Sequence, residues 1–209
     1  MQVNQVNTAS PPLILSPPGL IMVTGAPGTG KSVLSKVLST LVCATHIDKD
    51  VINEALRPRE MDARPFRSSE YYAKNVRRQS YEVMYALASA NLEYGVSVIL
   101  DAPHIEESRD PKWRSFIEQM ASSHGANLHV FQTILQLDKL HGRILERNAT
   151  RDHEFLTCDA AFASRVSKCP PDEEISWPNQ KVHIIDTNKG LTGKDIIEMM
   201  KYLLRDTEK

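Results

Sequence analysis

Residues 25–32 read Gly25-Ala26-Pro27-Gly28-Thr29-Gly30-Lys31-Ser32 and follow the apolar run Leu20 to Thr24. They fit the pattern G-x-x-x-x-G-K-[ST] at every specified position, between an expected strand and an expected helix. Glycines in such a loop let consecutive backbone N–H groups turn toward phosphate oxygens, and the following helix adds the positive end of its dipole. We therefore expect residues 25–32 to bind the triphosphate of ATP or a close relative. Lys31 should reach the outer phosphates, and the Ser32 hydroxyl should ligate Mg²⁺.

The rest of the chain alternates short runs rich in β-branched residues with longer segments of helical period, which predicts parallel strands joined by crossover helices. The expected strands are 20–24, 42–47, 96–100, 128–134 and 182–185. The expected helices are 31–41, 51–56, 70–94, 111–123, 137–148 and 193–204. Together they predict a three-layer α/β/α P-loop NTPase fold with a central parallel sheet of about five strands, in one domain over residues 19–209. Residues 1–18 are polar and broken by prolines, so we expect a flexible or loosely docked arm there.

Polar residues follow directly after four of the expected strands, namely Gly25, Asp48, Asp101 and Asp186. Right-handed crossovers return each parallel strand in the same direction, so these ends emerge at one edge of the sheet. Ligands of open α/β sheets bind at that carboxyl edge. We therefore expect residues far apart in the sequence to converge on one site.

The composition bounds the class of protein. Of the 209 residues 41% are hydrophobic and 24% charged, and the formal net charge is −1, from 25 basic and 26 acidic residues. This balance gives no global electrostatic reason to expect a nucleic-acid or membrane-surface protein. No apolar run approaches the roughly 20 residues of a membrane helix, and the N-terminus lacks a secretory signal. Cys43, Cys158 and Cys169 lack the paired spacing of a zinc site, so we expect reduced thiols in a cytoplasmic protein. The oligomeric state stays open.

Two carboxylates, Asp48 and Asp50, lie two residues apart at the end of the second expected strand. At that position both can face the γ-phosphate. Our hypothesis is that Asp50 accepts the proton of an attacking hydroxyl, while Asp48 supports the metal. The alternative is a solvated turn that caps a helix, because Asp is common at that position.

From the phosphate loop to Asp50 the sequence resembles the small P-loop kinases that phosphorylate a hydroxyl: the polynucleotide kinase, zeta toxin, chloramphenicol phosphotransferase and adenylylsulfate kinase group. The resemblance spans about residues 20 to 206, and only the phosphate loop in it is highly specific. It implies a strand-end Asp that acts as base. Several members place an Arg three residues after the second Asp, where this chain has Asn53, so that substrate contact is not implied here.

The resemblance continues through residues 94–104, which are similar to a third strand that ends in Asp. Asp101 is expected to hold Mg²⁺ through water, as the carboxylate of a Walker B strand does. The alternative is a structural Asp in a turn. His104 follows in the same loop and is either a substrate or proton partner or an incidental loop residue.

Three arginines, Arg143, Arg147 and Arg151, are spaced by four residues and form one stripe on a helix. In the resembled kinases a lid after the fourth strand carries such arginines, so we expect a helical lid at about residues 138–170. Arg147 is then the catalytic arginine that stabilises the transferring phosphate, and Arg143 binds the nucleotide. The alternative is a solvated helix face.

A second set of arginines lies between the second and third expected strands, where such kinases build the acceptor pocket. Its members are Arg57, Arg59, Arg64, Arg67, Arg77 and Arg78. They could receive an anionic acceptor or a nucleic-acid end, or they could simply be solvated. Phe66, Tyr71 and Tyr72 nearby either stack on a base or sugar or belong to the core.

These features favour an ATP- and Mg²⁺-dependent phosphotransferase that moves the γ-phosphate to a hydroxyl of a small molecule or nucleotide-like acceptor. A polynucleotide 5′-hydroxyl kinase remains an alternative, with nucleic acid possible but not favoured as a partner. A non-catalytic ATP-binding regulator or ATPase and an adenylate-kinase-like enzyme are further alternatives. A GTPase is excluded, since Asn188-Lys189-Gly190-Leu191 lacks the Asp of the guanine-specifying motif.

Overall fold

The chain is described by a computed structural model that places residues 11–59, 66, 69–147 and 159–205. Its centre is a five-stranded sheet in the order β2-β3-β1-β4-β5, and every neighbouring pair of strands is parallel. The strands are β1 (Gly19–Thr24), β2 (Ala44–Asp48), β3 (Ser97–Asp101), β4 (Asn127–Ile134) and β5 (Val182–Asp186). The predicted α/β class and five-strand parallel sheet are therefore confirmed.

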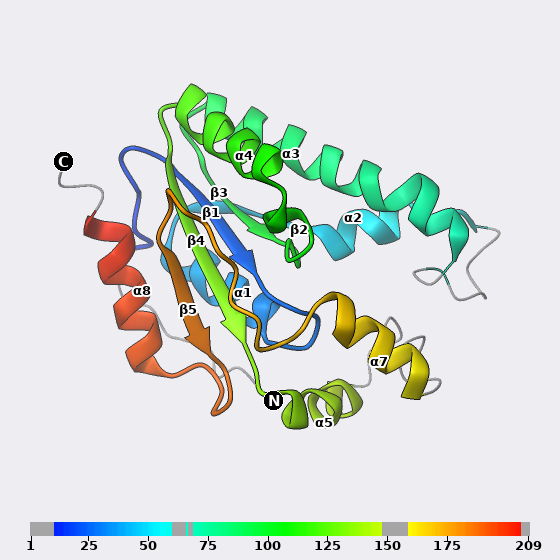
Figure 1. Cartoon of the computed structure of the whole chain (residues 1–209). Coiled ribbons are helices and arrows are strands. Elements are labelled where there is room, and N and C mark those ends of the chain that lie inside the picture. The colour runs from blue at the N-terminus through cyan, green and yellow to red at the C-terminus, as the bar shows by residue number, and fades with distance from the viewer. Residues whose placement is uncertain (1–10, 60–65, 67–68, 148–158, 206–209) are drawn as a thin grey trace.

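Helices cover both faces of this sheet and continue past its carboxyl edge (Figure 1). They are α1 (Lys31–Leu41), α2 (Lys49–Ala55), α3 (Arg77–Glu93), α4 (Pro111–Ser123), α5 (Leu137–Arg147), α7 (Asp159–Lys168) and α8 (Gly193–Arg205). A π-helical turn, η2 (Tyr72–Val76), precedes α3, and a short 3₁₀ turn, η3 (Glu107–Arg109), precedes α4. In Figure 1, α3 and α4 lie along one face of the sheet, while α5 and α7 lie beyond the strand ends.

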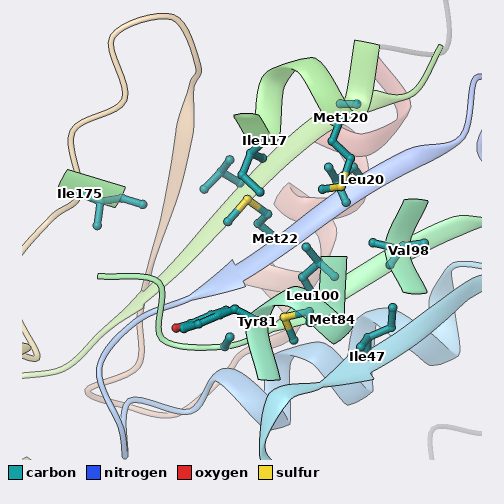
Figure 2. Close-up of a cluster of buried hydrophobic side chains, with 14 of the residues drawn as sticks. Leu20, Met22, Ile47, Tyr81, Met84, Val98, Leu100, Ile117, Met120 and Ile175 are labelled. Atoms are coloured by element: carbon teal, nitrogen blue, oxygen red, sulfur yellow. The ribbon is translucent and has the colours of Figure 1, made fainter. Parts of the chain in front are cut away.

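Two apolar clusters hold the layers together, one on each face of the sheet. Figure 2 shows the first, where Met84 of α3 and Ile117 of α4 lie against Met22 and Leu100 of the central strands. The second cluster lies on the opposite face, where α1 and α8 pack on Ile21, Val23, Ile99 and Phe131. Alternate residues of β1 thus point to opposite faces, and all six residues of that strand are buried. A strand buried on both faces has a continuous apolar sequence, which is what made residues 20–24 recognisable.

The predicted elements agree with the structure to within about two residues at most ends, but α7 and the 3₁₀ turn η3 were not predicted. Helices α1 and α4 have the predicted bounds. The predicted helix 70–94 begins with a π-helical turn, whose wider backbone leaves no mark in the hydrophobic period. Helix α7 was not predicted as a helix, although it lies within the segment predicted as a lid.

The N-terminal segment is docked where the structure describes it. The backbone N–H of Leu13 donates to the Leu41 carbonyl at 2.8 Å, and the N–H of Cys43 donates to the Leu13 carbonyl at 2.8 Å. Leu15 is 4% exposed and belongs to the apolar cluster under α1 and α8. Leu13 and Leu15 therefore extend the core, and residues 1–10 lie outside the described part of the chain.

None of the helices in the described ranges combines the length and the apolar character that a bilayer span requires.

Helix α8 offers a matched test of the second core, because Leu203 is fully buried and its neighbour Leu204 is 40% exposed. We expect Leu203→Ala to lower the free energy of unfolding by about 2–5 kcal/mol, since it removes buried methyl groups and leaves a cavity. Leu204→Ala should change the free energy by less than about 1 kcal/mol. Urea unfolding followed by circular dichroism measures both. Equal losses in the two variants would mean that α8 does not pack on the sheet as described.

Candidate functional site

The loop between β1 and α1 takes a conformation that favours glycine at three of its positions, Gly25, Gly28 and Gly30. Gly25 has φ +135° and Gly28 has φ +89°, both in the region that side chains avoid. A Cβ on Gly25 would lie 2.4 Å from the Thr133 carbonyl oxygen, so neighbouring β4 also excludes one. A Cβ on Gly28 would lie 2.7 Å from Leu140 and 3.0 Å from Ile144 of α5. The loop is thus closely packed between β4 and α5.

Bonds within the loop and to β4 hold its shape. The Thr29 hydroxyl donates to the Ala26 carbonyl at 2.7 Å and lies 2.7 Å from the Thr133 hydroxyl. The Lys31 ammonium donates to the Ala26 carbonyl at 3.0 Å, and the residue is 8% exposed. Lys31 is therefore buried against the phosphate loop, with its ammonium held by the loop backbone. Ser32 is half-buried in the first turn of α1.

A threonine that the sequence did not single out connects the loop to three other elements. The Thr187 hydroxyl, just after β5, donates to the Thr29 carbonyl at 2.7 Å and lies 2.9 Å from the Ile134 carbonyl. The Arg143 guanidinium of α5 donates to this hydroxyl at 3.1 Å and also to the Thr187 carbonyl. Arg143, predicted as a nucleotide contact, is thereby positioned beside the phosphate loop through Thr187.

Helices α5 and α7 pack on one another beyond the sheet edge, in the place predicted for a lid (Figure 1). Leu140 and Ile144 of α5 form a small apolar cluster with Phe162 and Val166 of α7. The same two residues of α5 are those that approach Gly28. Movement of this helix pair would therefore change the contacts of the phosphate loop directly.

Of the other two arginines of the stripe, the structure describes Arg147 but not Arg151. Arg147 is exposed at the last residue of α5. Arg151, and the rest of residues 148–158, lie outside the described part of the chain.

The carboxylates of Asp48 and Asp101 end adjacent strands next to the loop. The two residues are register partners in the β2–β3 ladder, and Asp101 also pairs with Val23 in the β3–β1 ladder. Asp101 is 3% exposed, and its Oδ2 lies 3.4 Å from His46 Nε2. Burial and the neighbouring Asp101 carboxylate raise the pKa of Asp48 above its usual value, although the N–H of Asp50 opposes this. The predicted convergence of these strand ends on the phosphate loop is thus seen for Asp48 and Asp101.

Asp186, at the fourth predicted strand end, accepts hydrogen bonds within its own turn. Its carboxylate is exposed and accepts from the backbone N–H of Asn188 at 2.8 Å and from the Asn188 side-chain amide at 2.6 Å. It lies on the edge strand β5, with β1 and β4 between it and the strands of Asp48 and Asp101.

Asp48 also begins α2, because its Oδ1 accepts from the backbone N–H of Asp50 at 2.8 Å. The helix-capping interpretation therefore describes its local bond, which leaves its other oxygen for a second role. Asp50 follows in the first turn of α2 and is half-buried. Lys49 between them is 5% exposed, and its ammonium lies 4.4 Å from the centre of the Tyr81 ring.

His104 is buried in an aromatic cluster and is not a loop residue in solvent. The residue is 0% exposed, and its ring lies 5.2 Å from Tyr81 and 5.3 Å from Trp113, measured between ring centres. Burial lowers the pKa of His104 to about 3, and the ammonium groups of Lys49 and Lys31 act in the same direction. The imidazole is therefore neutral at physiological pH.

The described arginines between β2 and β3 are mostly engaged with carboxylates. Arg77 forms ion pairs with Glu106 and Glu107 in the loop after β3, at 2.9 Å in the second case. These carboxylates raise the pKa of Arg77, although its burial opposes the charge. Arg78 pairs with Glu82 along α3 at 2.7 Å.

The remaining described residues of that segment either contact other side chains or are exposed. Arg57 pairs with Glu54 at 3.2 Å and lies 5.1 Å from the centre of the Phe66 ring. Phe66 is 1% exposed and belongs to the interior, whereas Tyr71 is 44% exposed. Arg59 is exposed, and Arg64 and Arg67 lie outside the described residues.

The residues at the strand ends fit a hard cation such as Mg²⁺. Asp101 Oδ2 is buried and has no hydrogen-bond partner among the described residues, and a cation would relieve its repulsion with Asp48. No group of three or more His, Cys, Asp and Glu residues in the described ranges could hold a metal by itself. Mg²⁺ commonly keeps several waters and shares its coordination with substrate phosphates, so it needs only one or two carboxylates from a protein.

The fold and this site define a kinase-type P-loop NTPase. The family model described as "AAA domain" matches residues 20–170, and the chain belongs to this family. The resemblance to small P-loop kinases drawn from residues 25–32 and 48–50 is confirmed. No protein of curated function matches the sequence significantly.

Solved structures show the same fold at low sequence identity. A candidate kinase from Chloroflexus aurantiacus j-10-fl is 20% identical with a TM-score of 0.67, over 89% of this chain and 98% of its own. A sugar kinase from Janibacter sp. HTCC2649 is 13% identical with a TM-score of 0.60, over 90% and 95% of the two chains. The APS kinase of Mycobacterium tuberculosis, solved with AMPPNP and APS, is 18% identical with a TM-score of 0.52, over 90% and 99%.

Substitutions at two glycines with positive φ distinguish the effect of backbone strain from that of a steric clash. Gly28 approaches α5, whereas Gly125 has φ +62° and open space where a Cβ would stand. We expect Gly28→Ala to weaken ATP binding at least about tenfold, because the loop must shift away from Leu140 and Ile144. Gly125→Ala should lower stability by about 1 kcal/mol and leave nucleotide affinity unchanged. Titration with a fluorescent ATP analogue measures the affinity, and equal affinities in the two variants would contradict the described approach of α5.

Proposed function

We propose that this protein is an ATP- and Mg²⁺-dependent phosphotransferase that moves the γ-phosphate of ATP to a hydroxyl group. One observation carries the proposal: a phosphate loop with a buried lysine lies beside two carboxylates at the ends of adjacent parallel strands. A module that only binds a nucleotide would not need a second acidic residue, Asp50, beside Asp48. The reduced thiols of Cys43 and Cys169 support a reducing, cytoplasmic setting.

In this proposal the donor half of the site consists of residues 25–32 with Arg143. The loop amides and the first turn of α1 bind the phosphates, and Lys31 exchanges its bond to the Ala26 carbonyl for phosphate oxygens. Ser32, Asp48 and Asp101 would hold Mg²⁺, directly or through water. The ion would neutralise charge on the phosphates as the transferred group leaves.

The acceptor half depends on Asp50. This residue lies in the first turn of α2, and its backbone N–H bonds the Asp48 carboxylate, so the two acidic residues adjoin the same end of the sheet. The Asp50 carboxylate would take the hydroxyl proton of the acceptor as the bond to phosphorus forms. Arg147 would then stabilise the charge that develops on the transferring phosphate.

Nucleic acid is a weaker acceptor candidate than a small molecule. A 5′-hydroxyl end brings several phosphates, which require unpaired cationic side chains. Arg77 and Arg78 are already paired with carboxylates, and Arg57 with Glu54. A regulator that binds ATP without transferring phosphate remains the second alternative, and product formation separates the two.

Two substitutions test the assigned roles of the loop lysine and the base. Lys31→Ala should abolish transfer, because it removes the charge that binds the outer phosphates. Asp50→Asn should leave the affinity for ATP within about threefold and lower kcat by about 10²- to 10⁴-fold, as expected for loss of a general base. Labelled ATP with a panel of acceptors measures transfer, and calorimetry measures ATP binding.

Asp186→Asn is the matched control for the Asp50 variant, because Asp186 also ends a strand but its described bonds lie within its own turn. Its kcat should stay within about twofold of the wild-type value. Transfer by Asp50→Asn at a rate close to wild type would show that Asp50 is not the base.

The assignment of Asp101 to the metal makes a separate prediction. Asp101→Asn keeps the shape of the buried side chain but removes its charge, so the Mg²⁺ concentration for half-maximal activity should rise about tenfold or more. Activity at saturating Mg²⁺ should recover in part. A variant with an unchanged Mg²⁺ dependence would assign Asp101 to fold stability alone.

A further inference from the structure

Two buried polar atoms between α2 and the loop after β3 have no hydrogen-bond partner among the described residues. They are Oδ1 of Asn53, which is 1% exposed, and Nε2 of His104, which is 0% exposed. Buried polar groups in native proteins are nearly always paired, so each exception calls for an explanation. Neither atom belongs to the phosphate loop or to the carboxylates assigned to the metal.

The two side chains are connected through Lys49 and Tyr81, and we call these four residues the acceptor patch. Asn53 lies one helical turn after Lys49, and these two form the buried face of α2. The Lys49 ammonium lies over the Tyr81 ring and donates to the Tyr72 hydroxyl at 3.3 Å. The Tyr81 ring in turn lies beside His104. Because Lys49 stands between Asp48 and Asp50 in the chain, the patch adjoins the proposed base.

The hydrogen-bonding state of His104 follows from its neighbours. The Tyr85 hydroxyl accepts from Trp113 Nε1 at 2.9 Å, which directs its own proton toward other acceptors. His104 Nδ1 lies 3.5 Å from that hydroxyl. The neutral ring then carries its proton on Nε2, so the unpaired atom is an N–H donor. The patch therefore presents one unpaired donor and one unpaired acceptor.

The backbone at His104 is strained in a way that fixes this donor. His104 has φ +50°, and among the described residues it is the one non-glycine residue with positive φ. Such conformations persist where the surroundings enforce them, and they gather at binding sites. Here the enforcement comes from α3 and α4, whose Tyr81 and Trp113 rings enclose the imidazole.

We propose that Asn53 and His104 recognise the acceptor, and that the acceptor is a neutral polyhydroxylated molecule of the sugar or polyol class. This inference rests on the proposed function, since it names the acceptor of the same site. A hydroxyl group both donates and accepts, so one hydroxyl can donate to Asn53 Oδ1 while another accepts from His104 Nε2–H. An anionic group only accepts and cannot satisfy Asn53 Oδ1. The face of Tyr81 suits the C–H side of a sugar ring.

Access to the patch depends on Lys49. Both unpaired atoms are covered in the described fold, and the long Lys49 side chain lies across Tyr81 beside them. A lysine side chain has several rotatable bonds and can withdraw toward Asp50 when an acceptor enters. The acceptor would then take the place of the ammonium over the Tyr81 ring, with one hydroxyl next to the base.

Asn53→Leu tests the inference because it separates recognition from stability. Leu has a similar volume and no polar atom, so the variant loses an unsatisfied acceptor and should unfold at the same or a higher temperature than wild type. Its affinity for a polyol acceptor should fall about tenfold or more, while its affinity for AMPPNP stays the same. A residue with only a structural role would give the opposite pattern, with a lower Tm and an unchanged affinity.

Ser35→Ala is the matched control. Ser35 Oγ is also buried and without a partner among the described residues, but it lies on α1. Its loss should leave both affinities unchanged. If Asn53→Leu fails to unfold cooperatively, Asn53→Ala replaces it, with the same expected loss of polyol affinity.

The measurement is the shift in Tm of the full chain with AMPPNP and Mg²⁺, against hexoses, pentoses, alditols and inositol. Sugar phosphates and a 5′-hydroxyl oligonucleotide are tested in parallel. A neutral compound that raises Tm in wild type and Ser35→Ala, but far less in Asn53→Leu, supports the inference. Preference for an anionic compound, no shift with any neutral one, or equal shifts in all three proteins overturns it.

Transfer from labelled ATP to the same compounds distinguishes this inference from the proposed function. A polyol that binds through Asn53 and is not phosphorylated supports the acceptor patch and overturns the phosphotransferase assignment. Phosphorylation of an anionic acceptor alone supports the phosphotransferase assignment and overturns the acceptor patch.

Discussion

The parallel pairing of β3 with both β1 and β2 is the constraint on which the site depends. Its register brings Asp101 opposite Asp48 on one side and Val23, two residues before the phosphate loop, on the other. Neighbouring strands are only about 4.8 Å apart, so like charges at their ends must repel one another. The raised pKa of Asp48 expresses that repulsion together with burial. A bound cation would stabilise such a fold, because it would relieve the repulsion between the two carboxylates. The relieved repulsion would add to the free energy of cation binding.

A second constraint acts through Thr187 and couples the phosphate loop to α5. One hydroxyl contacts the carbonyls of Thr29 and Ile134 and accepts from Arg143, so β4, β5, the phosphate loop and α5 share it. The approach of α5 to Gly28 is a steric link between the same elements. Phosphate binding that shifts the loop must therefore change the contacts of α5. Such coupling would connect occupancy of the donor site to the position of Arg143 and Arg147 on α5.

Periodicity and strand-end polarity sufficed to predict the sheet, the phosphate loop and the convergence of Asp48 and Asp101, because each depends on local sequence and on the handedness of crossovers. Thr187 could not be predicted, since a single threonine after a strand carries no pattern and its partners are remote. The ion pairs of Arg77 were also hidden, because Glu106 and Glu107 reach α3 only through tertiary packing. His104 lies in a loop as expected, but its burial between two helices could not be predicted, because it depends on tertiary packing. The roles of the site residues in catalysis remain predictions.

The proposed acceptor class depends on which side chains near the site have hydrogen-bond or ion-pair partners and which do not. Arg57, Arg77 and Arg78 already pair with carboxylates, whereas the neutral side chains of Asn53 and His104 each hold a buried atom without a hydrogen-bond partner among the described residues. An unpaired buried atom lowers stability, so each such atom calls for an explanation. Recognition by hydrogen bonds from buried groups is also the selective kind, because an acceptor that lacks the matching hydroxyl leaves them unsatisfied. The same atoms that weaken the fold would thus determine which hydroxyl compound reaches the base.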